Sequence, residues 1–569
     1  MSSPAPVDVG DALDDLINQF SDPMSFFREL IQNALDAGSD AVEIDFEFEA
    51  SARDRNSGAM IVIVADSGEG MDREIIDSKL TRLFSSGKDG DMTKIGKFGI
   101  GFVSVFAINP DAVCVDTARA GEAWRVLFDR QRNFKRLRID AAIEGTTIRI
   151  IKNSTRAEFE QFVARAKQVV RYWCGHAKGE VSVCGEIVTE PFGLDAPITV
   201  SYQDDLSHIF VGHTRDGQTL HGYFNGGLTL VQADQNHGSA IGDLVGLSFK
   251  VSSRYLEHTL TRDDVIKDRN FNKVVGRVRE LARDELRARV FTELDAAVRG
   301  EWPSDPGPAA DRLQLLYEAA AWHLHELQSP PRAHARLACA RSPGGRIWTW
   351  AELRKAVEDG LWFASARTPL SDAVEAREHP VLSSYGGVDE RSHASIADSV
   401  VRPLLRCVQL AFGIAEPGRW LGKDWFMPLA PEPGELRQWA GLANTAQRLL
   451  DDTDHKIARV AFGHFASSGS LLGGRAVISQ REFGEPTPRA ESGELAKGLF
   501  SRRRTLVVDA DHPTVRSLLG LAVREPELAA YQLVKLFLLA SGSISAAADS
   551  QIANVAMRYR ETRCPRPMS

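Results

Sequence analysis

Apolar and polar residues are arranged along the first 155 positions in a way that predicts two helices, a group of strands and a third helix. An amphipathic helix is predicted at residues 13–20, and a second helix runs from about Ser25 to Ala37, where Gly38 ends it. Short apolar runs bounded by turn residues predict strands at Ala41–Phe48, Met60–Ala65, Ala112–Thr117, Trp124–Phe128 and Thr146–Ile151. Between the second and third strands, an apolar helix is expected at Phe102–Ile108. Helices and strands in this order favour a two-layer α+β sandwich.

Beyond residue 155 the pattern predicts a helix from about Arg156 to Cys174, several strands, and a long charged helix at roughly Asn272–Arg299. These strands are expected at Thr199–Tyr202, Thr219–Phe224, Leu228–Gln232 and Ser248–Val251. Residues 300–308 hold three prolines and two glycines, which suit neither a helix nor a central strand and predict a linker. The expected domains are 1–155, 156–300 (an α/β middle domain), 310–434 (mixed α/β, of unknown role) and 435–569 (mainly helical).

Composition narrows the class of protein without identifying it. The chain has 569 residues and a formal net charge of −9, which argues against a protein whose whole surface binds nucleic acid. Six scattered cysteines form no CxxC pair, and the acidic N-terminus lacks the apolar core of a secretory signal. No stretch reaches the roughly 18 apolar residues of a membrane helix. A cytoplasmic protein with reduced thiols and no membrane segment is expected.

Three polar residues of the second predicted helix carry the first candidate chemistry. Glu29, Asn33 and Asp36 stand at positions i, i+4 and i+7, so they project from one helix face. The Asn33 side chain offers a neutral oxygen to Mg²⁺, and Glu29 could accept a proton from a water that attacks a phosphate. Taken alone, the same pattern also fits a surface helix with a polar stripe.

A second motif follows the predicted strand Met60–Ala65. A carboxylate at the strand end, Asp66, can accept a hydrogen bond from the exocyclic amine of adenine. Gly68 and Gly70 would let the backbone approach a flat ring, and Met71 can lie against the base. The alternative is an ordinary glycine-rich turn between a strand and a helix.

The third motif, residues 96–102, places glycines at 96, 99 and 101 before an apolar helix. Exposed backbone N–H groups at the start of a helix bind anions such as phosphates. By itself this spacing also fits a flexible turn. The chain has no GxxxxGK[ST] sequence and no dinucleotide-binding fingerprint, so it is not expected to be a P-loop or Rossmann enzyme.

In order and spacing, the three motifs together resemble the GHKL superfamily, which includes the Hsp90 chaperones, the B subunit of DNA gyrase, MutL and the sensor histidine kinases. The resemblance implies the Bergerat α/β sandwich, with ATP and Mg²⁺ as cofactors. It implies that Glu29 is the general base, Asn33 the Mg²⁺ ligand and Asp66 the adenine contact, supported by Thr146. Glu29 places the chain with the hydrolysing branch and not with the histidine kinases. The implied nucleotide-binding set also includes Asp36, Gly68, Gly70, Met71, Ser86, Gly87, Lys88, Gly96, Lys97, Phe98, Gly99, Ile100, Gly101 and Phe102.

Two further segments resemble Hsp90 in particular. Residues 78–88 look like the start of the Hsp90 lid, and residues 95–106 look like its phosphate loop, although the lid segment is short and is expected to close less completely. Residues 249–263 resemble a middle-domain segment of Hsp90, and the match places Arg262 on the arginine that reaches the γ-phosphate. The alternative is a loop arginine paired with Asp263 or Asp264.

The sequence therefore predicts an Hsp90-like chaperone that hydrolyses ATP to ADP in a clamp cycle, acts on client or partner proteins and forms a homodimer. Apolar residues at helical spacing between residues 515 and 538 suit either a core or such a dimer interface. The alternative is a MutL- or MORC-like GHKL switch in a DNA-related or defence pathway, which the acidic charge disfavours. A module that binds ATP without turnover is a third possibility.

Overall fold

The computed structural model describes residues 22–81, 100–215, 219–233, 242–259, 264–300, 307–327, 332–357, 360–384, 400–413, 418–422, 424–467, 475–489, 504–542 and 544–564. The chain divides into two compact units, Met1–Arg289 and Val290–Ser569. Each unit has hydrophobic cores of its own.

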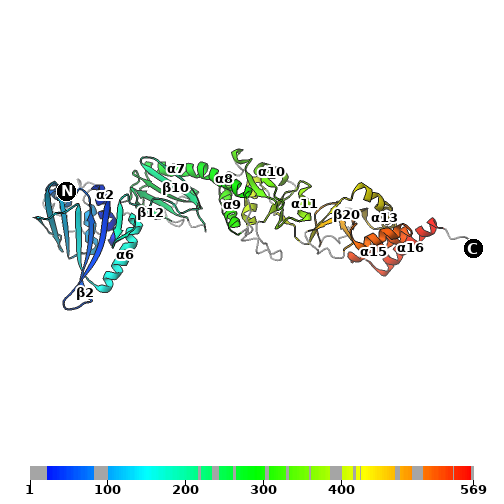
Figure 1. Ribbon diagram of the computed structural model, residues 1–569, viewed down its shortest axis with the longest axis horizontal. Helices are drawn as coiled ribbons and strands as arrows, with labels where there is room; N and C mark the ends of the chain where they lie inside the picture. Colours follow the sequence, from blue (N-terminus) through cyan, green and yellow to red (C-terminus); the bar gives the residue numbers. More distant parts are fainter. Residues whose placement is uncertain are drawn as a thin grey trace, which may run out of the picture. The chain divides into compact units, whose positions relative to one another are not determined.

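An eight-stranded sheet forms one layer of the first unit (Figure 1). Its strands are β1 Ala41–Ala50, β2 Ser57–Asp66, β3 Ala112–Arg119, β4 Glu122–Asp129, β5 Phe134–Arg138, β6 Thr146–Thr155, β7 Glu180–Val183 and β8 Glu186–Ile187. The spatial order is β5-β4-β3-β6-β2-β1-β7-β8, and only the β1–β7 pair is parallel. The five predicted strands are confirmed. β5 was missed because three of its five residues are basic, and β7 and β8 because they are short.

Helices cover one face of this sheet (Figure 1). They are η1 Pro23–Ser25, α2 Phe26–Asp36, α3 Arg73–Ile75, η2 Ile76–Leu80, α5 Ile100–Val103, η4 Ser104–Ile108 and α6 Arg156–Cys174. The predicted helix over 25–37 is confirmed as α2, whose apolar face places Phe27, Leu30 and Ile31 in the core. Gly38 has a φ of 80°, a conformation that suits glycine and turns the chain from α2 toward β1. The helix predicted at 13–20 lies outside the described residues.

Residues 156–188, which lie beyond the boundary predicted at residue 155, add one helix to the helical layer and two strands to the sheet. A capping box of Thr155 and Glu158 starts α6. The buried side chains Ala166, Val170 and Cys174 of α6 belong to the same core as α2. From α6 the chain returns as β7, which pairs with β1.

A second, five-stranded sheet completes the first unit. Its strands are β9 Ile198–Gln203, β10 Ser207–His213, β11 His221–Asn225, β12 Leu228–Ala233 and β13 Ser248–Ser253, in the order β12-β11-β13-β10-β9. After β12 come η5 Gly242–Leu244 and, beyond β13, α7 Arg269–Leu281, the π-helical η6 Ala282–Leu286 and α8 Arg287–Arg299. Phe271 of α7 contacts the Tyr223 ring of β11, with ring centroids 5.5 Å apart. The long predicted helix is therefore present, interrupted by a π-helical turn.

The boundary between the two units falls within α8, and the second unit continues with a mixed α/β part. Its elements are α9 Gly307–Leu327, η7 Arg332–His334, β14 Ala338–Arg341, β15 Ile347–Thr349, α10 Trp350–Ala356, β16 Trp362–Ala364, α11 Pro369–Glu375, β17 Val381–Ser383, α12 Val401–Phe412 and β18 Arg419–Trp420. β14 and β15 form an antiparallel pair, and β17-β16-β18 form a parallel sheet.

The last part of the chain contains several helices, as expected, and in addition a sheet that was not predicted. Its elements are β19 Trp425–Leu429, α13 Pro433–Asp452, β20 Ile457–Ser467, β21 Val477–Gln480, β22 Thr487–Pro488, β23 Arg504–Asp509, α14 Pro513–Ala522, α15 Pro526–Ala540 and α16 Ala546–Arg563. The strands form a sheet in the order β21-β23-β20-β19-β22. Leu506 and Val508 of β23 share a core with Phe537 of α15. The sheet was missed because short apolar runs in a helix-rich region do not distinguish buried strands from helices.

Within the described ranges, no helix is both long enough and apolar enough to cross a lipid bilayer.

Candidate functional site

Helix α2 holds the polar face predicted to carry the chemistry. Glu29 lies in the first turn, and its residue is only 6% exposed, whereas Asn33 and Asp36 are exposed further along the helix. Solvent exposure of these side chains thus increases along the polar face, from Glu29 to Asn33 and Asp36. This gradient suits a shielded base beside more accessible groups that can meet a metal ion or phosphates.

The start of α5 lies directly against Glu29. A Cβ placed on Gly101 would lie 2.7 Å from Glu29 Oε2, closer than such atoms normally approach. Glycine at this position therefore leaves room for the carboxylate. The neighbouring Phe102 is buried in the hydrophobic core, with its ring centroid 5.5 Å from that of Phe128. The Phe102 side chain consequently packs in the core.

Asp66 and Thr146 lie opposite each other on the neighbouring strands β2 and β6. Asp66 Oδ1 accepts a hydrogen bond of 2.9 Å from the Gly68 backbone N–H. Burial raises the pKa of the Asp66 carboxyl, while hydrogen bonds from the Gly68 and Thr146 backbones act in the opposite direction. The structure therefore brings together the carboxylate, the glycine and the threonine that the sequence assigned to adenine binding.

Thr117 is part of this group, although the sequence interpretation missed it. It is the last residue of β3 that pairs with β6, opposite Thr146, and the two hydroxyl oxygens are 3.0 Å apart. Thr117 Oγ1 also accepts a 2.8 Å hydrogen bond from the backbone N–H of Met71. Thr117 is fully buried, so it holds the Met71 segment to the sheet. Only the strand register reveals this contact, because nothing in the local sequence distinguishes Thr117 from other strand threonines.

Glycines let three chain segments meet around Asp66. Gly70 has a φ of 65°, and a Cβ there would lie 2.1 Å from the Ala118 carbonyl oxygen. Gly145, also at 65°, would bring a Cβ within 2.0 Å of the Asp66 carbonyl oxygen. Both positions therefore require glycine. Gly145 was not among the predicted site residues.

The loop after Asp66 is also fixed to the end of α2. The Glu69 backbone N–H donates to the Ala37 carbonyl at 3.0 Å. Ser39 Oγ accepts a 3.0 Å hydrogen bond from the Ser67 N–H and donates to the Ala41 carbonyl at 2.6 Å. Helix α2 and the Asp66 loop are therefore held in one arrangement.

Several predicted site residues lie outside the described part of the chain. They are Ser86, Gly87, Lys88, Gly96, Lys97, Phe98, Gly99 and Arg262. Ile100 is the first residue of α5. Of the predicted phosphate-loop glycines 96, 99 and 101, the structure thus describes only Gly101, and the roles of the residues outside the described part stay predictions.

The described chain on both sides of Arg262 forms a short paired stem. His258 and Val265 make an antiparallel bridge, and the Thr259 N–H donates to the Asp264 carbonyl at 2.9 Å. The Ile266 N–H donates to the Glu257 carbonyl at 2.7 Å. Burial, followed by the charge of Arg28 on α2, lowers the pKa of His258, so the stem lies near the helix that carries Glu29.

These residues fit a magnesium-bound nucleotide. Glycine at 68 and 101 lets the chain pack closely beside Asp66 and Glu29, and Asn33 offers an exposed oxygen. Among the described residues, no three His, Cys, Asp or Glu side chains gather as a metal site.

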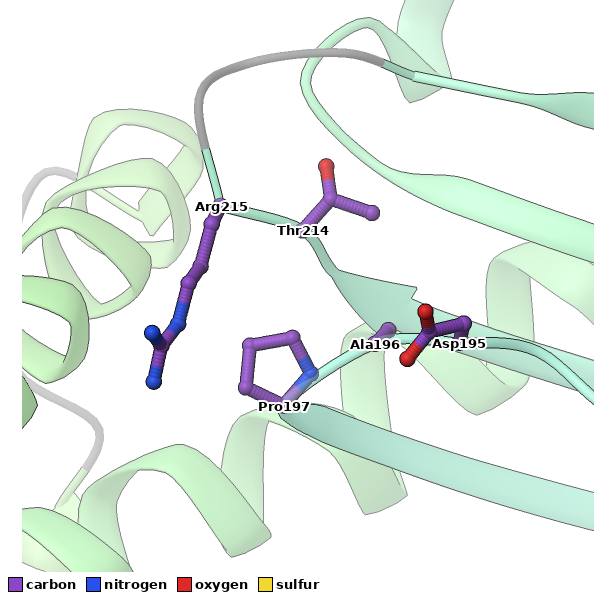
Figure 2. A pocket seen from close by; sticks show the side chains of 5 residues that line it. All are labelled: Asp195, Ala196, Pro197, Thr214 and Arg215. Carbon is purple, nitrogen blue, oxygen red and sulfur yellow. The ribbon is translucent and has the colours of Figure 1, made fainter.

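A separate hollow of about 470 Å³ lies at one end of the second sheet (Figure 2). Asp195, Ala196 and Pro197, before β9, and Thr214 and Arg215, after β10, line it. None of the predicted site residues is among them, so the hollow is distinct from the group around Glu29 and Asp66.

Comparison with known families agrees with this geometry. Residues 24–161 match the family described as histidine kinase-, DNA gyrase B- and HSP90-like ATPase. The matched range begins just before α2 and ends within α6, so it contains Glu29, Asp66 and Thr146.

Several curated proteins are similar to parts of the chain. Chaperone protein HtpG of Rhodospirillum rubrum is 27% identical over 258 residues, which cover 38% of this chain and 40% of the relative. HtpG of Anaplasma phagocytophilum is 32% identical over 177 residues, which cover 26% of this chain and 27% of the relative. DNA mismatch repair protein MutL of Ehrlichia chaffeensis is 28% identical over 132 residues, covering 22% and 18%. In each case the match spans two fifths of the relative's length or less.

Proposed function

Because residues 24–161 belong to the GHKL, Hsp90-like ATPases, we propose that this protein binds ATP with Mg²⁺ and hydrolyses it to ADP and phosphate. The observation that carries the proposal is the shielded Glu29 carboxylate, which sits in the first turn of α2 against Gly101. A shielded carboxylate held in this way is suited to act on a water molecule next to a phosphate.

In the proposed reaction, Glu29 orients a water and accepts its proton as the water oxygen bonds to the γ-phosphorus. The bond between that phosphorus and the bridging oxygen breaks, and ADP leaves. Asn33 would supply a protein oxygen to the magnesium ion, which neutralises phosphate charge when bound. Asp36, exposed one turn further on, would interact with the metal's water ligands.

Asp66 would select adenine. Its carboxylate accepts hydrogen bonds and can receive the exocyclic N–H of adenine, and Thr146 lies opposite it on β6. Met71, half-buried and held by Thr117, would lie against the base. Guanine carries an oxygen where adenine carries this amine, so the site would discriminate against GTP.

We further propose that Arg262 acts on the γ-phosphate. A guanidinium there would stabilise the negative charge of the transition state. The paired stem around Arg262 lies near Arg28, the residue before Glu29, and this proximity supports the assignment.

At the level of the whole protein, we propose an ATP-dependent chaperone that acts on client proteins as a homodimer. The named HtpG relatives support the chaperone function. Large apolar side chains are exposed on or beside the C-terminal helices, at Val523 (84%), Leu528 (44%), Leu539 (53%) and Met557 (57%). A second copy of the chain would bury them.

A MutL-like switch in a DNA-related or defence pathway is the second candidate, because a MutL protein also matches 22% of this chain. The two candidates differ in what the ATPase should respond to. A DNA-acting switch should bind DNA with an affinity that falls steeply with salt, whereas a chaperone should suppress aggregation of an unfolded protein only with ATP.

Glu29→Ala tests the catalytic core of the proposal. We expect ATP binding to persist and phosphate release to fall to background, because the base is lost while the adenine site remains. Glu47→Ala, an exposed glutamate on β1, is the matched control and should keep full turnover. Wild-type turnover in Glu29→Ala would overturn the assignment. Measuring turnover per chain over a range of protein concentrations tests the dimer, since a dimer-dependent ATPase rises with concentration.

A further inference from the structure

The turn between β11 and β12 packs against the C-terminal end of α6. Gly226 and Gly227 form it with φ values of 59° and 86°. A Cβ on Gly227 would lie 1.8 Å from the His176 carbonyl oxygen, so the two backbones are in direct contact. Next in the chain, Leu228 belongs to the core that contains α2, and Thr229 Oγ1 donates to the Tyr172 carbonyl at 2.6 Å. The turn is therefore fixed to the nucleotide-binding part of the first unit.

The other side of the same turn holds the paired stem, residues 256–259 and 264–266. Asn225 ends β11, and its Nδ2 donates a 2.9 Å hydrogen bond to the Leu256 carbonyl. Leu256 is only 1% exposed, and its N–H donates to the Ser253 carbonyl at 3.2 Å. The residue that begins the stem is thus fixed by the turn on one side and by β13 on the other.

The end of α6, which the β11–β12 turn contacts, also contacts α2. Trp173, next to Tyr172 on α6, lies under the Arg28 guanidinium, whose Cζ is 5.1 Å from the ring centroid. Arg28 is 3% exposed and directly precedes Glu29. A continuous set of contacts therefore runs from the stem through Asn225, the glycine turn and the end of α6 to the helix that carries Glu29.

We propose that the β11–β12 turn sets the position of the paired stem relative to α2, and that Asn225 is the positioning residue through its hydrogen bond to the Leu256 carbonyl. This inference rests on the proposed function, in which the stem presents Arg262 to the nucleotide. Asn225 reaches the stem through its hydrogen bond to the Leu256 carbonyl and is not one of the residues assigned to catalysis or adenine binding. Its effect on turnover is accordingly indirect.

Asn225→Asp is the sharpest variant, because the side chain keeps its shape but loses the donor and places a carboxylate oxygen against the Leu256 carbonyl. Asn272→Asp is a matched control, since Asn272 Nδ2 donates to a backbone carbonyl (Asp268, 2.9 Å) on the exposed side of α7. Amide hydrogen exchange followed by mass spectrometry reports the stem without any need for turnover.

We expect Asn225→Asp to speed exchange of the amides in residues 256–266 while leaving those of α2 unchanged. Turnover should fall at least tenfold, and the affinity for ATP should stay within about twofold. In an Arg262→Ala background, Asn225→Asp should cause no further loss of turnover, since two residues acting through one contact are not additive. Asn272→Asp should change none of these values.

Unchanged exchange of residues 256–266 in Asn225→Asp would overturn the positioning role. So would full turnover of Asn225→Asp when Arg262→Ala is slow, and in that case the proposed function stands. Wild-type turnover in Arg262→Ala would refute the role proposed for Arg262. The stem would then have no part in catalysis. An equal loss of turnover from Asn225→Asp in both backgrounds would show a general structural effect instead of positioning.

Discussion

Replacing Gly101 by alanine tests the contact between α5 and Glu29 directly. The Cβ would lie 2.7 Å from Glu29 Oε2 and 3.6 Å from its Cδ. Non-bonded atoms rest at about 3.5 Å, so the carboxylate must move by roughly 0.8 Å. The φ of Gly101 lies outside the left-handed region, and alanine suits a helix. The substitution therefore displaces a carboxylate without breaking the backbone.

The size of the effect follows from that displacement. Misplacing a catalytic group by about 1 Å costs on the order of a hundredfold in rate. For Gly101→Ala we expect kcat to fall between about tenfold and a hundredfold, which corresponds to roughly 1.4 to 2.7 kcal/mol of activation free energy. KM should change by less than about threefold, because the adenine group around Asp66 is untouched.

Steady-state phosphate release at saturating ATP gives kcat, and calorimetric titration gives the affinity for the nucleotide. Gly276→Ala on α7 is the control, since a Cβ there meets nothing within 4 Å. This control should retain kcat and gain up to about 1 kcal/mol of stability, because alanine is the better helix former.

A kcat for Gly101→Ala within twofold of the wild type, with ATP still bound, would refute the reasoning. The carboxylate beside α5 would then have no role in the chemical step. A loss of ATP affinity equal to the loss of turnover would instead place Gly101 in phosphate binding.

Two further predictions concern adenine recognition and acid stability. Asp66→Asn should lower ATP affinity at least tenfold with little change in Tm. The amide oxygen can still accept the hydrogen bond from the Gly68 N–H, whereas the amide N–H₂ would face the adenine amine, donor against donor. Calorimetry measures the affinity, and an unchanged affinity would exclude Asp66 as the adenine contact. Burial lowers the pKa of His213 to about 4, so the unfolded chain takes up the proton first as pH falls. Above the ordinary histidine pKa of about 6.5, His213 does not lower the free energy of unfolding. Between pH 7 and pH 5 it lowers the free energy of unfolding by about 2 kcal/mol, and the loss continues until the pH reaches the folded-state pKa. Urea unfolding at the two pH values should show a correspondingly smaller acid loss for His213→Leu, and an equal loss in both proteins would contradict the linkage.

Local sequence was sufficient where the chemistry depends on residues close together in the chain. The spacing of Glu29, Asn33 and Asp36 placed them on one face of α2 because helical periodicity alone determines it. Asp66 at a strand end was likewise readable from its neighbours. The sequence interpretation missed Thr117, whose role depends on strand register. Thr117 belongs to the adenine group only because the pairing of β3 with β6 places it opposite Thr146.

The errors in the C-terminal part have a different cause. The run that forms β23 is buried at four consecutive positions, Thr505 to Val508, and apolar at the last three. A short apolar run of this kind fits a helix equally well. Strand pairing with β20, which lies almost forty residues earlier, decides the outcome. Pairing over that separation is not encoded in any short window.

The pairing of β7 with β1 has a practical consequence for the isolated nucleotide-binding part. A fragment that ends at residue 155 would expose the backbone N–H and C=O groups of Ala41–Ile44, which β7 otherwise satisfies. It would also uncover the part of the core that α6 fills with Ala166, Val170 and Cys174. An open strand edge beside exposed apolar surface promotes aggregation. Soluble expression of this part therefore calls for a C-terminal end beyond Val188.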